Sequence, residues 1–123
     1  MKAVHFGAGK IGRGFIADLL HNTGYEITFV DVNEKLNAEM NQYHNYYLYV
    51  IQEDYRRKEI DKVSALSPIT QPEEVTQAIT DADLVTTAVI ADNFPKIANN
   101  LAAGLKARLD AGKERVNVIP CEN

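Results

Sequence analysis

The sequence predicts an α/β domain in which crossover helices cover both faces of a parallel β-sheet, a doubly wound arrangement. Three observations support this prediction. Short apolar runs alternate along the chain with longer segments that have helical periodicity. Four glycines fall within positions 7–14, between the first apolar run and the first helical segment. A second apolar run, at 26–30, ends in an acidic residue, Asp31.

The first predicted unit is a strand, a helix and a second strand. Residues 3–6 (AVHF) are typical of a buried strand, and 11–22 have the periodicity of a helix. Gly24 suits the end of this helix, and 26–30 (EITFV) predict the second strand. The apolar residues of the helix are expected on one buried stripe: Ile11, Phe15, Ile16, Leu19 and Leu20.

The middle of the chain is less regular. Residues 34–42 predict a short helix. Tyrosines and aliphatic residues then alternate over 46–51, and the charged stretch QEDYRRKE (52–59) is typical of a turn. We therefore expect an extended or hairpin excursion that leads into a third strand near 62–66.

The second half returns to the alternating pattern. Helices are predicted at 73–80 and 93–111, and strands at 83–89 (DLVTTAV) and 116–120 (VNVIP). Apolar residues spaced at three or four predict the buried stripe of the longer helix: Phe94, Ile97, Leu101, Leu105 and Leu109. Neither a linker nor a second domain is evident, so residues 1–123 are expected to form one domain.

The glycines have a specific spacing and context. Gly7, Gly9 and Gly12 match G-x-G-x-x-G, with a predicted strand before them and a predicted helix after them. Asp31 follows at the end of the second predicted strand. This combination is the fingerprint of a Rossmann-type dinucleotide-binding domain, whereas the glycine pattern alone would be weak evidence. The alternative is a glycine-rich turn without a ligand.

Each glycine has a separate physical role in such a turn. Gly7 permits the sharp change of direction, Gly9 lets a pyrophosphate approach the backbone, and Gly12 lets the helix pack closely on the strands. The free N–H groups at the start of the helix attract the phosphates. The residues predicted to bind the cofactor here are Phe6, Gly7, Ala8, Gly9, Lys10, Ile11, Gly12 and Arg13.

Two cations lie unusually close to this helix start. Lys10 and Arg13 are unfavourable beside the positive end of a helix dipole, by roughly 0.3–1 kcal/mol each. An anion bound at the turn would explain both. Alternatively, both side chains point into solvent, where screening makes the cost small.

The ends of other strands complete the predicted site. Asp31, with Val32 and Asn33, is expected to hold the adenosine ribose, and no arginine follows in DVNEK, which favours NAD over NADP. Alternatively, Asp31 caps the next helix. Small residues end the fourth predicted strand and would line the cofactor, or simply pack in the core: Thr87, Ala88 and Val89.

The fifth predicted strand leads into Cys121, Glu122 and Asn123. Ligands of open parallel sheets bind beyond the carboxyl ends of the strands. These three residues would therefore face the nicotinamide end of a bound cofactor. The alternative is a frayed polar terminus.

Composition excludes several classes of partner. The net charge of −4 and a pI of about 5.3 argue against nucleic acid and against an anionic membrane surface. The single cysteine forms no disulfide within the chain, and the absence of a Cys/His cluster predicts no metal site. No apolar run is long enough to span a bilayer, and no signal peptide is evident, so a cytoplasmic location is expected.

Four segments together carry a likeness to a known family: MKAVHFGAGKIGRGFI, FVDVNEK, DADLVTTAV and VIPCEN. The chain resembles the polyol-specific long-chain dehydrogenases over essentially all of its 123 residues, which would be about the first third of a family member. The resemblance implies NAD-linked, metal-free interconversion of D-mannitol 1-phosphate and D-fructose 6-phosphate. The polyol or sugar phosphate would be the small-molecule partner.

The resemblance also implies where the catalytic groups lie. The family's general-base lysine belongs to a helical C-terminal domain, which this chain lacks. The asparagine that lies near the substrate carbinol corresponds to Asn123. One position departs from the family, which usually has glycine after the TTAV segment where this chain has Ile90.

The chain contains no evident general base of its own for hydride chemistry. We therefore expect it to bind NAD(H) but to turn over negligibly. The residues alone leave a second class of function open, a stand-alone regulatory module that senses NAD(H) and controls a partner.

Overall fold

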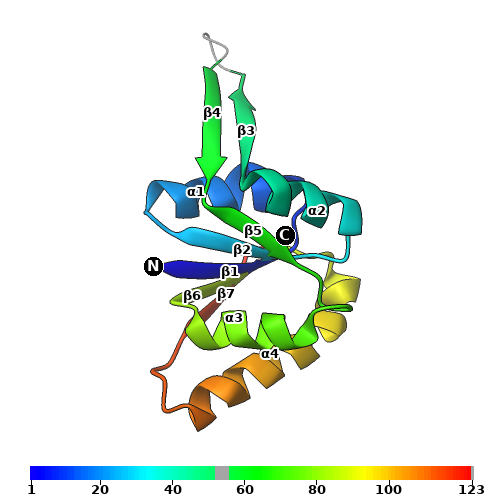
Figure 1. Cartoon of the computed structure of the whole chain (residues 1–123), viewed down its shortest axis with the longest axis vertical. Helices are drawn as coiled ribbons and strands as arrows, with labels where there is room; N and C mark the ends of the chain where they lie inside the picture. The colour runs from blue at the N-terminus through cyan, green and yellow to red at the C-terminus, as the bar shows by residue number, and fades with distance from the viewer. Residues whose placement is uncertain (52–55, 123) are drawn as a thin grey trace.

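The computed structural model describes residues 1–51 and 56–122 (Figure 1). Its centre is a parallel sheet of five strands in the order β5-β2-β1-β6-β7. The order reverses direction at β1, which pairs with both β2 and β6, as in one half of a doubly wound sheet. The predicted fold class is therefore confirmed. The strands are β1 (Lys2–Phe6), β2 (Glu26–Val30), β5 (Val63–Leu66), β6 (Leu84–Thr87) and β7 (Asn117–Pro120).

Helices cover both faces of this sheet, as Figure 1 shows. One face carries a π-helical segment, η1 (Gly12–Ile16), its continuation α1 (Ala17–Asn22), and α2 (Glu34–Tyr43). The other face carries α3 (Pro72–Asp81) and α4 (Phe94–Asp110), which follows a short 3₁₀ turn, η2 (Ala91–Asn93).

The core is divided between the two faces of the sheet. Side chains alternate along β1, so that Ala3 packs under α1 and Val4 packs under α3. Phe29 on β2 is fully buried under α1 and α2. Since both faces are covered, the strands are apolar on both sides, which is why they appear in the sequence as short continuous apolar runs.

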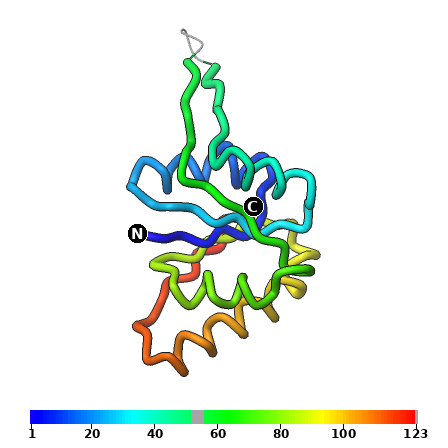
Figure 2. The backbone as a smooth tube through the Cα atoms, viewed as in Figure 1, coloured from blue at the N-terminus to red at the C-terminus, as the bar shows by residue number. Residues whose placement is uncertain are grey.

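The predicted excursion in the middle of the chain is an antiparallel hairpin, β3 (Asn45–Val50) with β4 (Arg56–Asp61), which projects from the domain (Figure 2). The prediction of a turn over 52–59 was wrong for residues 56–59, which belong to β4. They pair with β3, and the guanidinium carbon of Arg57 lies 4.3 Å from the ring centre of Tyr47. The rest of that predicted turn, 52–55, lies outside the described residues.

The hairpin is attached to α1 by polar contacts as well as by packing. His21 Nε2 lies 2.6 Å from a carboxylate oxygen of Asp61, and this contact lowers the pKa of Asp61. Lys58 reaches both Asp18 and Asn22 on the helix. These pairs hold the base of β4 beside the helix that follows the glycine turn.

The predicted stripe on the first helix was only partly correct. Ile16 and Leu20 are buried, but Ile11, Phe15 and Leu19 are 45%, 60% and 52% exposed. The buried side of the helix instead consists of Gly12, Ile16, Ala17 and Leu20, so two small residues occupy places that the prediction gave to larger apolar ones. An exposed apolar stripe remains on the outer side of the helix.

The predicted stripe on α4 was also wrong at its end. Ile97 is buried, but Leu105 and Leu109 are exposed, and Gly104 and Arg108 are buried in their place. A Cβ at Gly104 would lie 2.5 Å from side-chain atoms of Ile79, so α4 meets α3 through a glycine. This close approach turns the leucines away from the interface.

Within the described ranges, no helix is both long enough and apolar enough to cross a membrane.

Candidate functional site

A cleft of about 610 Å³ lies at the carboxyl ends of β1 and β2, where the order of the sheet reverses. Open parallel sheets bind their ligands at this place. Five of the predicted residues line it, Phe6, Gly7, Asp31, Val32 and Val89. The remaining lining residues come from the end of β2, from the β5–α3 loop, and from η2 and α4.

Gly7 forms the turn between β1 and the helix. Its φ of +99° lies in the region that residues with a side chain rarely adopt. A Cβ at this position would overlap the carbonyl oxygen of Ala88, and the Gly7 N–H donates to the Val30 carbonyl at 2.9 Å. The turn is therefore fixed between β2 and the loop after β6.

Gly9 and Gly12 occupy opposite environments. Gly12 is buried, and a Cβ there would lie 2.8 Å from Nε2 of His5 and against the carbonyl oxygen of Gly7. Gly9 is exposed, and a Cβ there would meet nothing within 4 Å. The space beside Gly9 is open, as close approach of a ligand to the backbone requires.

Asp31 is bound to the glycine turn. Its Oδ2 accepts a hydrogen bond from the Ala8 N–H at 2.7 Å, and its Oδ1 accepts one from the Asn33 N–H at 2.8 Å. The alternative in which Asp31 caps the next helix was wrong. Asn33 is the residue that caps α2, because its side chain accepts from the Leu36 N–H at 3.1 Å. Asp31 thus connects the end of β2 to the glycine turn.

The cations of the turn differ in burial. Lys10 is exposed at the start of the helix. Arg13 is half-buried, and its Nε is buried without a hydrogen-bond partner among the described residues. Ile11 between them is 45% exposed. Burial raises the pKa of the nearby Tyr46, whose hydroxyl donates to the Arg13 carbonyl at 2.7 Å.

The end of β6 is held by a carboxylate. Glu122 Oε1 accepts from the Thr87 hydroxyl at 2.5 Å and from the Val89 N–H at 3.4 Å. The strand ends at Thr87, so Ala88 and Val89, predicted as strand residues, lie in the following loop. The Ala88 N–H continues the ladder by donating to the Phe6 carbonyl at 2.9 Å.

The structure describes Ile90 but not Asn123, the two other positions singled out in the sequence. Ile90, the departure from the family pattern, is 73% exposed and is not part of the cleft lining. Asn123, the predicted substrate-side residue, lies outside the described residues.

His5 lies beneath the glycine turn and is fully buried. Its Nδ1 lies 2.5 Å from the Thr86 hydroxyl, and its ring meets Phe29 edge-to-face. Burial lowers the pKa of His5 from 6.5 to about 4. The ring therefore stays neutral in the folded protein at neutral pH.

This burial predicts a pH-dependent stability. The unfolded chain takes up a proton on His5 near pH 6.5, and the folded chain only near pH 4. The unfolded state therefore binds more protons between these values, and stability falls as the pH falls. We expect the wild-type protein to lose about 2 kcal/mol more than His5→Asn between pH 7 and pH 5.

The measurement is urea unfolding of both proteins at the two pH values, with circular dichroism to confirm that the variant is folded. An equal loss in the two proteins would contradict the assignment of this loss to His5.

Sequence reasoning missed part of the cleft. Asn93 at the end of η2 lines it, as do Lys96 and Asn100 on α4. Pro68 and Ile69 line it from the loop after β5. The three polar residues are spaced at three and four, which marks one side of a helix, and this helix follows a sheet strand. That spacing in the sequence could have indicated a polar side of the helix facing the cleft.

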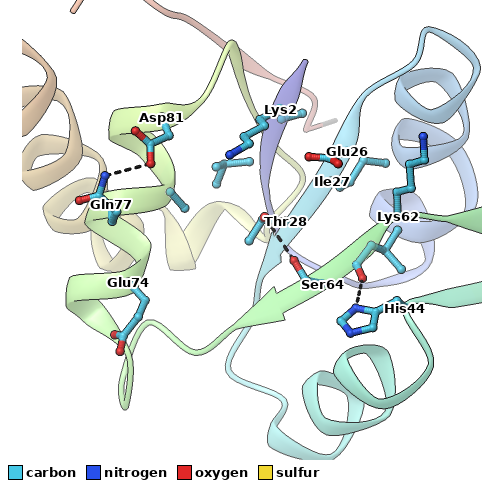
Figure 3. A pocket seen from close by; sticks show the side chains of 14 residues that line it. Lys2, Glu26, Ile27, Thr28, His44, Lys62, Ser64, Glu74, Gln77 and Asp81 are labelled. Carbon is cyan, nitrogen blue, oxygen red and sulfur yellow. Dashed lines mark hydrogen bonds between the residues drawn. The ribbon is translucent and has the colours of Figure 1, made fainter.

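A second hollow, of about 530 Å³, lies at the opposite end of the strands. Figure 3 shows Thr28 and Ser64 on the sheet and Glu74, Gln77 and Asp81 along α3, and these five residues line the same hollow. Thr28 and Ser64 lie 3.4 Å apart, and Gln77 donates to Asp81 at 2.9 Å. Its position at the amino ends of the strands sets it apart from the predicted site.

The described residues contain no group of three or more His, Cys, Asp or Glu side chains placed to hold a metal ion.

Comparison with known proteins agrees with the geometry. The family model of the mannitol dehydrogenase Rossmann domain matches residues 1–123. The chain belongs to this family. Mannitol-1-phosphate 5-dehydrogenase of Shouchella clausii is 47% identical over 123 residues, and that of Enterococcus faecalis is 42% identical over 124. Each alignment covers 100% of this chain and 32% of the relative.

This member of the mannitol dehydrogenase family thus spans about a third of the length of the curated relatives it matches. A solved structure of D-mandelate dehydrogenase with NADH shares its fold, with a TM-score of 0.67 at 18% identity. That alignment covers 100% of this chain and 34% of the other.

Proposed function

We propose that this chain is the dinucleotide-binding domain of an NAD-dependent enzyme that interconverts D-mannitol 1-phosphate and D-fructose 6-phosphate. One observation carries the proposal. In a chain of the mannitol dehydrogenase family, the glycine turn lies at the reversal point of the sheet and is joined to Asp31 by the Ala8 hydrogen bond. The proposed reaction is inferred from the relatives, which are mannitol-1-phosphate 5-dehydrogenases.

The geometry fits a dinucleotide. Backbone N–H groups at the start of η1 and the open space beside Gly9 would receive the pyrophosphate. Lys10 and Arg13 would balance its charge. Phe6, Gly7, Ala8, Ile11 and Gly12 would form the walls of the turn, and Thr87, Ala88 and Val89 would line the far half. The bound dinucleotide supplies the hydride chemistry, and the protein positions it.

Asp31 supports NAD over NADP. Both of its carboxylate oxygens already accept backbone N–H groups, and each retains a lone pair for a ribose hydroxyl. A 2′-phosphate would be repelled by the same carboxylate. Lys96 is the cationic residue of the cleft lining, and it projects from α4 on the other side of the cleft.

The substrate side belongs to the remainder of the enzyme. Among the described residues that line the cleft, Lys96 is the one with a side-chain amine and none is a histidine, so we propose that the general base lies in a further, C-terminal domain. The exposed apolar side chains of Ile11, Phe15 and Leu19 offer that domain a surface beside the glycine turn. The known relatives, three times as long, favour this enzyme over a stand-alone NAD(H) sensor.

Calorimetric titration of the purified protein with NADH and, separately, with NADPH tests the proposal. We expect NADH to bind with clear preference. Gly9→Ala is expected to weaken NADH binding more than tenfold, because its Cβ would occupy the space assigned to the pyrophosphate and meets nothing in the protein.

Gly14→Ala is the matched control, since a Cβ there also meets nothing within 4 Å, but Gly14 lies within the π-helical segment η1 and Gly9 lies in the turn before it. It should bind NADH as the wild-type protein does. A folded wild-type protein that binds neither dinucleotide would overturn the proposed function. Rapid turnover of this chain alone with fructose 6-phosphate would overturn the assignment of the base to a further domain.

A further inference from the structure

We propose that Glu122 sets the redox preference of the site, favouring the oxidised dinucleotide over the reduced one. The inference rests on the proposed function and goes beyond it, because it concerns which form of the cofactor the domain holds more tightly. Three observations carry it: the anchoring of the carboxylate, the absence of a neutralising partner, and its position along the sheet.

The carboxylate is anchored rather than free. Glu122 follows β7, which is joined to β6 through the Cys121 N–H and the Thr87 carbonyl at 2.7 Å. Its Oε1 then accepts from the buried Thr87 hydroxyl and from the Val89 N–H. Two donors from the neighbouring strand end therefore fix the position of the negative charge.

No described ion pair balances this charge. None of the ion pairs between described residues includes Glu122. The ring of His5, inside the sheet, feels the charge of Glu122 but is held neutral by burial. A half-buried carboxylate with only neutral donors leaves a negative potential beside Val89, which lines the cleft.

The position along the sheet assigns this potential to one half of the cofactor. Asp31 lies on the β2 side of the reversal point, where the adenosine ribose is expected, and Glu122 lies on the β6–β7 side. A dinucleotide across the reversal point would therefore place its nicotinamide near Glu122. The oxidised ring is cationic and the reduced ring is neutral, so the carboxylate stabilises the oxidised form selectively.

The test measures the dissociation constants of NAD⁺ and NADH for three variants by calorimetry. Glu122→Gln keeps the size of the side chain and an oxygen acceptor for Thr87, but removes the charge. We expect it to shift the ratio of the two constants toward NADH by about fivefold to tenfold, as for one unit charge acting over roughly 10 Å in a partly solvated cleft.

Two controls separate charge from structure. Glu39→Gln removes the same charge from the exposed side of α2 and should leave the ratio within twofold of wild type. Thr87→Val removes the anchoring hydroxyl but keeps the charge, so both affinities should fall while their ratio changes less than in Glu122→Gln.

The outcomes distinguish this inference from the proposed function. Binding of both cofactor forms to Glu122→Gln with an unchanged ratio would overturn the role of Glu122 and leave the dinucleotide site intact. An equal shift of the ratio in Thr87→Val and Glu122→Gln would assign the effect to loop geometry and would also overturn it. Failure of the folded wild-type protein to bind either form would overturn the proposed function itself.

Discussion

Gly12→Ala is expected to destabilise the protein by about 1–3 kcal/mol and to weaken dinucleotide binding at least tenfold. The new Cβ would lie 2.8 Å from Nε2 of His5 and against the carbonyl oxygen of Gly7. Neither neighbour is free to move, since His5 is held by Thr86 and Gly7 is bonded to the Val30 carbonyl. The helix must therefore shift away from β1, and the turn shifts with it.

Urea unfolding gives the stability, and NADH titration gives the affinity. Gly14→Ala again serves as the control, because it lies in the same π-helical segment but faces open space. It should be as stable as the wild-type protein or up to about 1 kcal/mol more stable, since alanine restricts the unfolded chain. Equal stability of the two variants would show that the helix does not pack on His5 as described.

Arg108→Met is expected to destabilise the protein by about 3 kcal/mol. Arg108, on α4, is only 8% exposed, and its guanidinium donates hydrogen bonds to carbonyl groups at the end of α3. Nη1 donates to the Thr80 and Ala82 carbonyls at 2.8 and 2.7 Å, and Nη2 donates to the Glu114 carbonyl at 2.6 Å. Methionine fills much of the same volume but leaves these carbonyls without their donor. It also removes a cation from the negative, C-terminal end of α3.

Thermal and urea unfolding monitored by circular dichroism measure this effect. Lys106→Met removes a cation from the exposed side of α4, the helix that carries Arg108, and should change the stability by less than about 0.5 kcal/mol. A similarly small change for Arg108→Met would mean that water replaces the guanidinium at these carbonyls.

The central strands of the main sheet, β1, β2 and β6, were predictable because they are covered on both faces. A strand such as Glu26–Val30 must then be apolar, and the polar residue that ends it marks the edge of the sheet. The glycine turn was predictable for a related reason. The conformation of Gly7 and the packing at Gly12 both exclude a side chain, so these requirements are visible in the sequence itself.

For two helices, the spacing of apolar residues did not predict which side is buried. In the first helix, the small residues Gly12 and Ala17 share the buried side with larger apolar ones, whereas Phe15 faces outward. In α4, a glycine and an arginine occupy the buried face. Arg108 is buried because carbonyl groups from another helix surround it, and such partners are known only once the chain is folded.

The same limit applies to the site. Gly9 and Asp31 could be predicted because they belong to one local motif, whereas Lys96 lines the cleft from a helix that the fold brings there. The hydrogen bond from Thr87 to Glu122 joins two strand ends that only the parallel pairing of β6 and β7 makes neighbours. Predicting it requires the order of the sheet, not only its strands.

The central position of β1 has a consequence for synthesis of the protein on the ribosome. β1, the first strand to be synthesised, pairs with β2 on one side. Its other side can pair only after β6 has been synthesised, and the Lys2 N–H can donate to the carboxylate of Asp83 only then. An unpaired strand edge is therefore exposed while most of the domain is still being translated. Closure of this long-range pairing is expected to be the slow step of folding, and the period before it is when the nascent chain is most prone to aggregate.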